Sequence, residues 1–397
     1  MTHPYADLPD RQFWKRDPAL RHPEQLDPGS SIPFRIAPSD RIVTAGSCFA
    51  QHLARKLAPL GLSHFVTEVA HPIIPPSVRE KHNYGLFSAR YGNVYTPRQL
   101  LQLVKRATGQ FQPVATAWKA ESGPGVVDPF RPGILPGGYT SAAEILADRQ
   151  YHLTCVRRSL AEMDVFVFTL GLTECWEDVR DGAIFPIAPG VAGGTFDPAE
   201  VRFRNFDETE CWSDLERAIT LIREINPTVR IVLTVSPVPL AATYENRHVL
   251  LSTTWSKAVL RVVAEKAARR FDLCAYFPSY EIITAPHVRG RYFAGDCREV
   301  LPAGVDHVMR AFRKTFVAQI SEQSVPVPVG SVNQPDHHLA EMARDMELLC
   351  DELMLDERAR SVRGDIPPTP PRAKPPNVAS YRLSPWAARL LRLLSRK

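Results

Sequence analysis

The sequence contains no apolar stretch that approaches the ~20 residues needed by a membrane-spanning helix, and its first residues are polar and rich in proline. This N-terminus lacks the basic start and apolar run of a secretion signal. The seven cysteines form no CxxC pair, which argues against a cysteine-based metal site and a disulfide framework. We therefore expect a cytoplasmic protein with reduced thiols.

The excess of basic over acidic charge is confined to the C-terminus. The net charge is +5, and residues 382–397 alone contain Arg382, Arg389, Arg392, Arg396 and Lys397 with no acidic residue. The rest of the chain is formally neutral and lacks the footprint of a nucleic-acid binder. Neither a phosphate-binding glycine pattern nor an HExxH motif occurs. We expect no nucleic-acid partner, no cofactor and no metal.

The composition divides the chain into three zones. Residues 1–38 form a proline-rich lead-in, residues 39–320 the main domain, and residues 321–397 a helix, a proline-rich linker and a basic amphipathic C-terminal helix. That last helix, at 382–397, has two interpretations: docking on its own protein or a partner, and attachment to a membrane surface.

The main domain alternates short apolar runs with helical patterns. The runs are RIVTAG (41–46), DVFVFTLG (164–171) and RIVLTVSP (230–237). Strands that are apolar throughout indicate a parallel sheet covered by helices on both faces, and so an α/β fold. In such folds ligands bind at the carboxyl ends of the strands.

The first strand end carries the string GSCFA. Ser47 follows the strand at the start of a helix, whose N–H groups can stabilise negative charge. This position suits a nucleophile in acyl transfer, although serine also serves as a simple helix cap. Cys48 is the alternative nucleophile, because a thiol at a helix N-terminus gains acidity; its simpler interpretation is a small buried apolar residue.

Other loops add polar candidates. Gly171 and Thr173, followed by Glu174, come after the second strand, and Gly92 and Asn93 lie in the stretch NYGLFSARYGNVYT. Each could contact a developing oxyanion or substrate, or act as a cap or tight turn. Asp296, shortly before the last predicted helix, could orient a base or cap a turn.

Several strings together resemble one family. GSCFA, SARYGNVYT, FTLGLTECWED, PIAPG, TVSPVPL, HVLLSTTWSKAVLR and YFPSYEI occur in order over about 39–315 and resemble the GSCFA family. That family is grouped with the SGNH or GDSL-like hydrolases. The resemblance implies a three-layer α/β/α sandwich in which a serine after the first strand attacks an ester.

The resemblance also implies residue roles. Ser47 matches the nucleophile, and the N–H groups of Ser47 and Gly92 with Thr173, in the G-x-N-D block, would hold the oxyanion. In the D-x-x-H block Asp296 matches the aspartate, but Glu299 occupies the histidine position.

The identity of the general base therefore stays open. His248 follows a strand end and is the preferred candidate; His307 lies on the last helix, where its position on the helical wheel predicts that it faces solvent. Glu299 would serve if burial raised its pKa. Without any base, the serine would be a poor nucleophile and the protein a binding module.

Aromatic and basic side chains indicate the substrate. Trp176, Trp255, Tyr91 and Tyr95 would stack on a sugar ring or simply pack, and Arg90 would bind an acidic sugar or phosphate group. The predicted function is a serine esterase or O-acyltransferase acting on an O-acyl ester of a small molecule or carbohydrate, an O-acetyl group included. The alternative is a non-catalytic carbohydrate-binding or scaffold protein.

Overall fold

The computed structural model describes residues 3–29, 32–121, 123–317, 351–352 and 354–355. Every described residue belongs to one compact unit. The predicted proline-rich linker and basic C-terminal helix lie outside the described residues, as does nearly all of the helix predicted before them.

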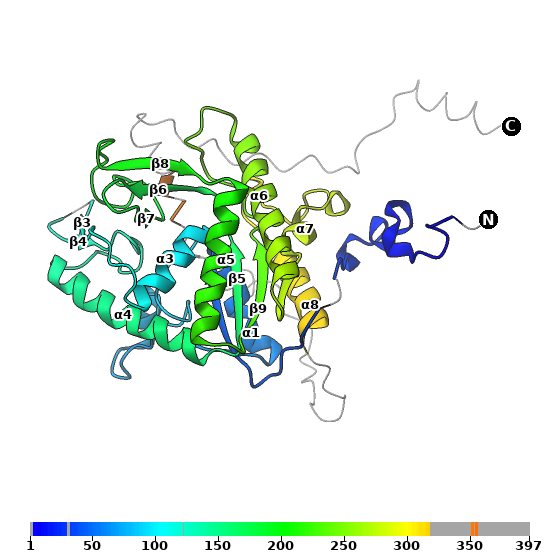
Figure 1. Cartoon of the computed structure of the whole chain (residues 1–397), viewed down its shortest axis with the longest axis horizontal. Helices are drawn as coiled ribbons and strands as arrows, with labels where there is room; N and C mark the ends of the chain where they lie inside the picture. The colour runs from blue at the N-terminus through cyan, green and yellow to red at the C-terminus, as the bar shows by residue number, and fades with distance from the viewer. Residues whose placement is uncertain (1–2, 30–31, 122, 318–350, 353, 356–397) are drawn as a thin grey trace, which may run out of the picture. The chain divides into compact units, whose positions relative to one another are not determined.

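A five-stranded sheet forms the centre of the domain (Figure 1). Its strand order is β10-β9-β5-β1-β2, and each neighbouring pair is parallel. The strands are β1 (Arg41–Gly46), β2 (Ser63–His64), β5 (Val165–Leu170), β9 (Arg230–Val235) and β10 (Cys274–Phe277). The three apolar runs of the sequence thus form β1, β5 and β9 side by side.

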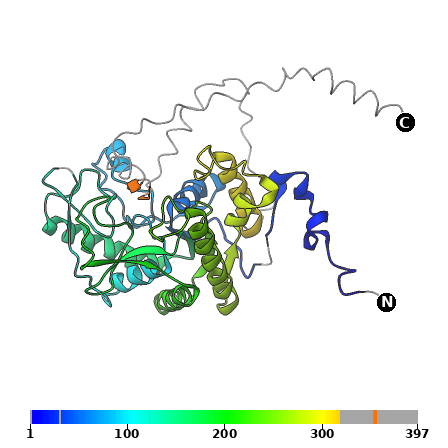
Figure 2. The same ribbon diagram turned by 90° about the horizontal axis from the view of Figure 1, so that it is seen from above.

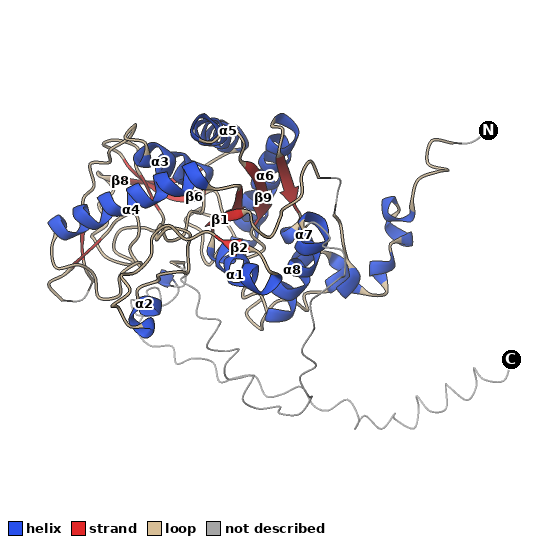
Figure 3. Cartoon of the chain, turned by 90° about the horizontal axis from the view of Figure 1, so that it is seen from below, coloured by secondary structure: helices blue, strands red, loops and turns tan. Residues whose placement is uncertain are grey.

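Helices cover both faces of this sheet (Figures 2 and 3). Val43 and Phe166 belong to one core cluster, whereas Ile42 and Val167, which alternate with them, belong to another. The first cluster includes side chains of α3 (Pro97–Ala107), α4 (Ala142–Glu162), α5 (Glu208–Ile225) and α6 (Val249–Arg270). The second includes those of α1 (Cys48–Leu57), α7 (Ser279–Thr284) and α8 (Pro302–Phe316). The predicted three-layer α/β/α sandwich is confirmed.

A second, antiparallel sheet begins soon after β5. It has the order β7-β6-β8 and comprises β6 (Glu174–Asp178), β7 (Ile184–Phe185) and β8 (Val201–Asn205). A hairpin of β3 (Trp118–Lys119) and β4 (Val126–Val127) and the short helix α2 (Pro76–Lys81) complete the named elements. The sequence analysis did not predict these pieces; β3, β4 and β7 have two residues each and α2 has six, which are too few to show a periodicity.

The lead-in contains four short 3₁₀ helices, Asp10–Gln12, Trp14–Arg16, Pro18–Leu20 and Pro23–Gln25. The Trp14 ring lies 4.9 Å from that of His287, in the 3₁₀ helix Pro286–Val288. A further 3₁₀ turn, Ala58–Leu60, follows α1.

The sheet topology locates a crevice. Counted among themselves, the parallel strands have the order 2-1-3-4-5, so the connections after β1 and β5 leave in opposite directions. Ligands in such folds bind at this switch point, outside the carboxyl ends of the strands. Among the described residues, no helix is both long and apolar enough to cross a bilayer.

Candidate active site

Ser47 occupies the turn from β1 to α1 and is the N-cap of that helix. Its side chain makes no capping hydrogen bond, and the residue is 3% exposed. The Oγ atom is buried and has no hydrogen-bond partner among the described residues. Leaving a buried hydroxyl unpaired costs free energy, so the arrangement is typical of a group that meets a ligand.

Two glycines allow the strand ends to approach closely. Gly46 has a φ of +140°, and a Cβ there would lie 2.3 Å from the Thr169 carbonyl oxygen. A Cβ on Gly171 would lie 3.1 Å from the Ser47 Cβ and 2.9 Å from Cδ1 of Tyr95. The backbone after β5 therefore lies directly against Ser47.

Asn93 is joined to the same turn. The Val94 N–H donates to the Gly46 carbonyl at 2.8 Å, and Gln51, one helical turn after Ser47, donates to Asn93 Oδ1 at 3.0 Å. The Asn93 Nδ2 group in turn donates to an Asp351 carboxylate oxygen at 3.0 Å. The Asn93 amide is thus a hydrogen-bond donor in a loop that contacts the Ser47 turn, and its predicted contact with an oxyanion or substrate stays a prediction.

Two acidic residues from beyond the last helix reach this site. Burial raises the pKa of Asp351 to about 6, and the hydrogen bond from Asn93 opposes the shift. The neighbouring Glu352 accepts from Arg298 Nη2 at 2.8 Å. Asp351 is therefore partly protonated near pH 6.

Lys257, on α6, supplies a buried amine. It is 2% exposed, and its Nζ donates to the Gly171 carbonyl at 2.6 Å. Burial lowers the pKa of Lys257 to about 8, while Glu352 and Cys48 act in the opposite direction. The amine is thus held on the residue whose backbone packs against Ser47.

Comparisons with known proteins agree with the resemblance. A model of the GSCFA family matches residues 41–312. The chain belongs to the GSCFA family. Among solved structures, a match is the family 3 carbohydrate esterase of Clostridium thermocellum, at 12% identity, with 70% of this chain and 94% of that chain covered and a TM-score of 0.30. At that TM-score the likeness carries no argument about activity. No curated protein matches significantly.

The oxyanion donors predicted for this GSCFA protein need correction. Thr173 is fully buried; its Oγ1 donates to Asn205 Oδ1 at 2.7 Å and its N–H to Ser256 Oγ at 2.9 Å. The Ser47 N–H donates to the Thr169 carbonyl at 3.1 Å. Both groups are therefore engaged in packing the strand ends. Gly92 has a φ of +70° and forms the turn before Asn93; its N–H stays a predicted donor.

Neither His248 nor His307 forms a hydrogen bond with Ser47, because the Ser47 Oγ has no partner among the described residues. His248 is exposed and caps α6, its Nδ1 accepting from the Leu250 N–H at 3.1 Å. His307 is 3% exposed and bonded on both ring nitrogens at 2.8 Å, to Tyr292 Oη and the Leu26 carbonyl. The prediction that His307 faces solvent is wrong, because the lead-in covers that side of α8.

The D-x-x-H block forms an exposed turn. The Asp296 carboxylate accepts from the N–H groups of Arg298 and Glu299, at 2.9 and 3.0 Å. Both acidic side chains are exposed, and neither contacts Ser47. Asp296 therefore stabilises its own loop and orients no base, and Glu299 lacks the burial that its proposed role required.

Arg90 does not serve as a free ligand for an acidic substrate. Its guanidinium is buried and lies 3.5 Å from Glu68 and 3.6 Å from Asp148, and it also donates to the His82 carbonyl at 3.0 Å. This predicted binding role is wrong because partners within the protein already use the side chain.

The predicted aromatic candidates separate into two groups. Trp176 lines a cavity of about 130 Å³ together with Tyr244 and Phe203, whose ring centroids lie 4.8 and 5.7 Å from its own. Tyr91 and Tyr95 are buried in the core instead.

Trp255 is 44% exposed on α6 and does not line that cavity. Glu174, predicted to bind substrate, also lines it, but its carboxylate accepts from Thr243 Oγ1 at 2.6 Å and from the Tyr244 N–H at 3.2 Å. Burial raises the pKa of Glu174. This side chain holds the loop after β9 in place.

Sequence reasoning missed two functional candidates, Lys257 and Asp351. Lys257 carried a signal, because it shares the apolar side of α6 with Leu260 and Ala264, at helical spacing. A lysine on a buried helix face requires an explanation. Asp351 carried none, since only the folded chain brings it to Asn93.

Proposed function

We propose that this GSCFA protein is a serine esterase or O-acyltransferase in which Ser47 attacks an O-acyl ester. The observation that carries the proposal is the buried, unpartnered Oγ of Ser47 at the N-terminus of α1, on the topological switch point of the sheet. The helix N-terminus would stabilise the negative charge that develops on the ester oxygen.

Lys257 would act as the general base. A neutral lysine amine can activate a serine without a histidine, and its lowered pKa places the neutral form within reach near pH 8. The amine would take the Ser47 proton as Oγ bonds to the ester carbon, and would then return a proton to the leaving alcohol. Its hydrogen bond to the Gly171 carbonyl fixes its position during these steps.

Asn93 would donate to the oxyanion. In the present structure its Nδ2 group donates to a carboxylate oxygen of Asp351. The carbonyl oxygen of a bound ester, or the oxyanion of its tetrahedral intermediate, would be an acceptor of the same kind. Substrate would therefore replace Asp351 on this donor.

The cavity beside Trp176 would hold the alcohol part of the ester. It is lined by Leu172, next to Gly171, and by Glu352, so it borders the residues around Ser47. Aromatic rings such as Trp176 stack well on sugar rings, and we therefore propose an O-acyl carbohydrate as the substrate class. Fold alone does not fix that substrate.

A fluorophosphonate probe, which modifies activated serines, tests the nucleophile. We expect labelling of the wild-type protein, loss in Ser47→Ala and retention in Cys48→Ala, a matched substitution at the next position. Loss in Cys48→Ala alone would assign the reaction to the thiol. A wild-type protein that stays unlabelled at pH 8–9 would contradict the catalytic proposal.

One observation favours a second function, carbohydrate binding without catalysis. Neither candidate histidine contacts Ser47, and the D-x-x-H loop is exposed. Glycan binding that is equal in wild type and Ser47→Ala, together with an absence of labelling, would support it. Labelling that requires Ser47 would exclude it.

A further inference from the structure

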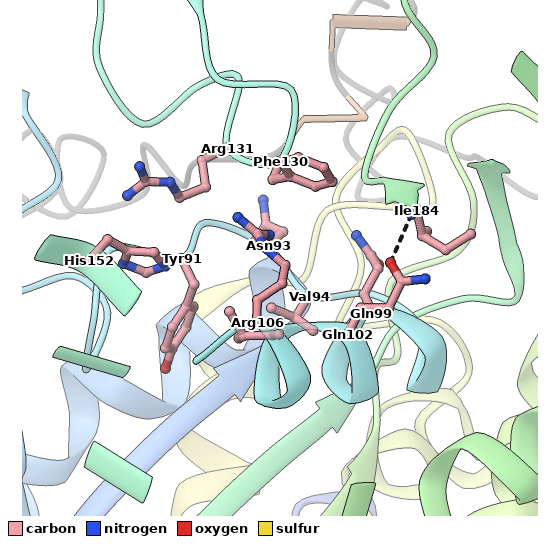
Figure 4. Close-up of a pocket in the computed structure, with 11 residues that line it drawn as sticks. Tyr91, Asn93, Val94, Gln99, Gln102, Arg106, Phe130, Arg131, His152 and Ile184 are labelled. Atoms are coloured by element: carbon pink, nitrogen blue, oxygen red, sulfur yellow. Dashed lines mark hydrogen bonds between the residues drawn. The ribbon is translucent and has the colours of Figure 1, made fainter. Parts of the chain in front are cut away.

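A cluster of buried charges surrounds a second cavity behind Asn93 (Figure 4). The cavity measures about 30 Å³ and is lined among others by Asn93, Arg106, Arg131 and His152. In Figure 4, Phe130 and Arg131 lie opposite the side chains that rise from α3. One ordered water requires only ~10–15 Å³ by this measure, so the cavity can hold a small ligand.

Three guanidiniums of the cluster are already paired. Arg131 lies 3.0 Å from Asp128 and 2.8 Å from Asp148. Arg149 lies 2.7 Å from the same Asp128 carboxylate. Arg90 contacts Glu68, the third carboxylate, which also accepts from His152 Nδ1 at 2.7 Å.

Arg106 is the exception in this cluster. Its Nε and Nη2 atoms are buried and have no hydrogen-bond acceptor among the described residues. Its guanidinium carbon lies 4.2 Å from the centre of the Phe130 ring. Burial lowers the pKa of Arg106, and the nearby Arg149 and Arg131 lower it further, against the attraction of Asp128.

The charge balance of the cluster is therefore positive. Four guanidiniums, including Arg106, face three carboxylates. His152 adds no charge at neutral pH, because burial lowers its pKa to about 4. Arg106 is partly exposed as a residue, but its buried Nε and Nη2 groups lack an acceptor among the described residues, which is unfavourable. A neutral water would accept from these groups, whereas an anion would also offset the excess positive charge of the cluster.

We propose that this cavity binds a compact anion, chloride or a carboxylate group, on the free N–H groups of Arg106. The cavity volume excludes a bulky anion, and the guanidinium excludes a cation. Asn93 lines the cavity and also contacts Asp351, so the bound anion would lie directly behind the Ser47 site. The proposal does not depend on the chemistry of Ser47.

Thermal unfolding in different sodium salts tests it, because a ligand that binds only the folded state raises the Tm with its concentration. At equal ionic strength we expect the Tm of the wild type to rise with chloride or acetate relative to gluconate, which is too large for the cavity. Arg106→Met should abolish the difference. Lys105→Met, which removes a charge from the adjacent position of α3, should retain it.

An equal response to all three salts, or an equal response of wild type and Arg106→Met, would overturn the proposal. Should Arg106→Met fail to fold, wild-type crystals grown with bromide give an independent answer. An anomalous peak within hydrogen-bond distance of Arg106 Nε or Nη2 supports the site, and an empty cavity at high bromide refutes it.

Discussion

The carboxyl ends of β1 and β5 and the loop before α8 are the two regions that should share the chemistry of an SGNH-like hydrolase, and they differ sharply. At the strand ends, the buried Ser47 packs against Gly171, whose carbonyl accepts from Lys257. In the loop, Asp296 and Glu299 are exposed to water and serve the turn itself.

The difference shows which part of such a site depends on the backbone. The position of Ser47 follows from the strand, the helix and two glycines that permit close approach. A general base is a single side chain, and another element can supply it. Here α6 brings Lys257 to the strand ends.

The largest expected effect follows from removing each candidate general base in turn. Lys257→Met should slow fluorophosphonate labelling by about 10²–10⁴-fold, the usual contribution of a general base. His248→Ala and Glu299→Gln should change the rate by less than about threefold, because His248 is an exposed cap of α6 and Glu299 lies in an exposed turn. Labelling rates measured for the three variants at pH 8 decide the matter.

The folded state of each variant requires a control, since Lys257 is buried. Circular dichroism and a Tm within a few degrees of wild type would show that Lys257→Met retains the domain. A labelling rate that falls in His248→Ala but not in Lys257→Met would reverse the assignment of the base.

A second prediction concerns the backbone at the strand end. Gly46→Ala should destabilise the domain by about 4 kcal/mol, in the range typical of a severe clash, because the new Cβ would meet the Thr169 carbonyl oxygen at 2.3 Å. Gly61→Ala is the matched control: its φ is also positive, +74°, but its Cβ meets nothing within 4 Å.

We expect a cost of about 1–2 kcal/mol in that control. Urea unfolding of both variants measures the difference. Equal losses would mean that positive φ alone, and not the approach to β5, requires a glycine at position 46.

Much of the nucleophile side could be predicted from the sequence. The apolar runs of β1, β5 and β9 predicted the parallel sheet, and the ends of the first two indicated Ser47 and Gly171. Periodicity also located the long helices. The roles of Thr173 and Arg90 could not be predicted, because residue type does not show whether a side chain already has an internal partner.

The surroundings of His307 and Asp351 were less predictable, for a physical reason. His307 lies opposite the apolar stripe of α8, which predicts exposure for an isolated helix. The lead-in buries it through a hydrogen bond to the Leu26 carbonyl, 281 positions away in the chain. Asp351 likewise reaches Asn93 from 258 positions away. Such long-range contacts leave no local pattern.

The third prediction concerns the pH dependence of the labelling rate. If neutral Lys257 is the base, the labelling rate should rise about tenfold per pH unit and level off above pH 8, since its pKa is lowered to about 8. A rise centred near pH 6.5, the ordinary pKa of histidine, would instead indicate an imidazole. The pH–rate profile of Lys257→Met should lack the rise near pH 8.

The smallest expected effect concerns the acid that contacts Asn93. The pKa of Asp351 is about 6 in the folded protein and 3.8 in its ordinary state. Between these values the folded state binds more protons than the unfolded state, so the contribution of Asp351 to stability is lost as the pH rises from about 4 to 6. Asp351→Asn stays neutral and can still accept from Asn93.

Asp351→Asn should therefore exceed the stability of wild type by up to about 3 kcal/mol at pH 8, and the two should converge at pH 4. Urea unfolding at both pH values measures this. Asp296→Asn, in the exposed turn of the other region, is the control and should not show the gain at pH 8. A variant Asp351→Asn that is less stable than wild type at pH 8 would mean that the ionised carboxylate is the favoured partner of Asn93, and that substrate must displace a charged group to reach this donor.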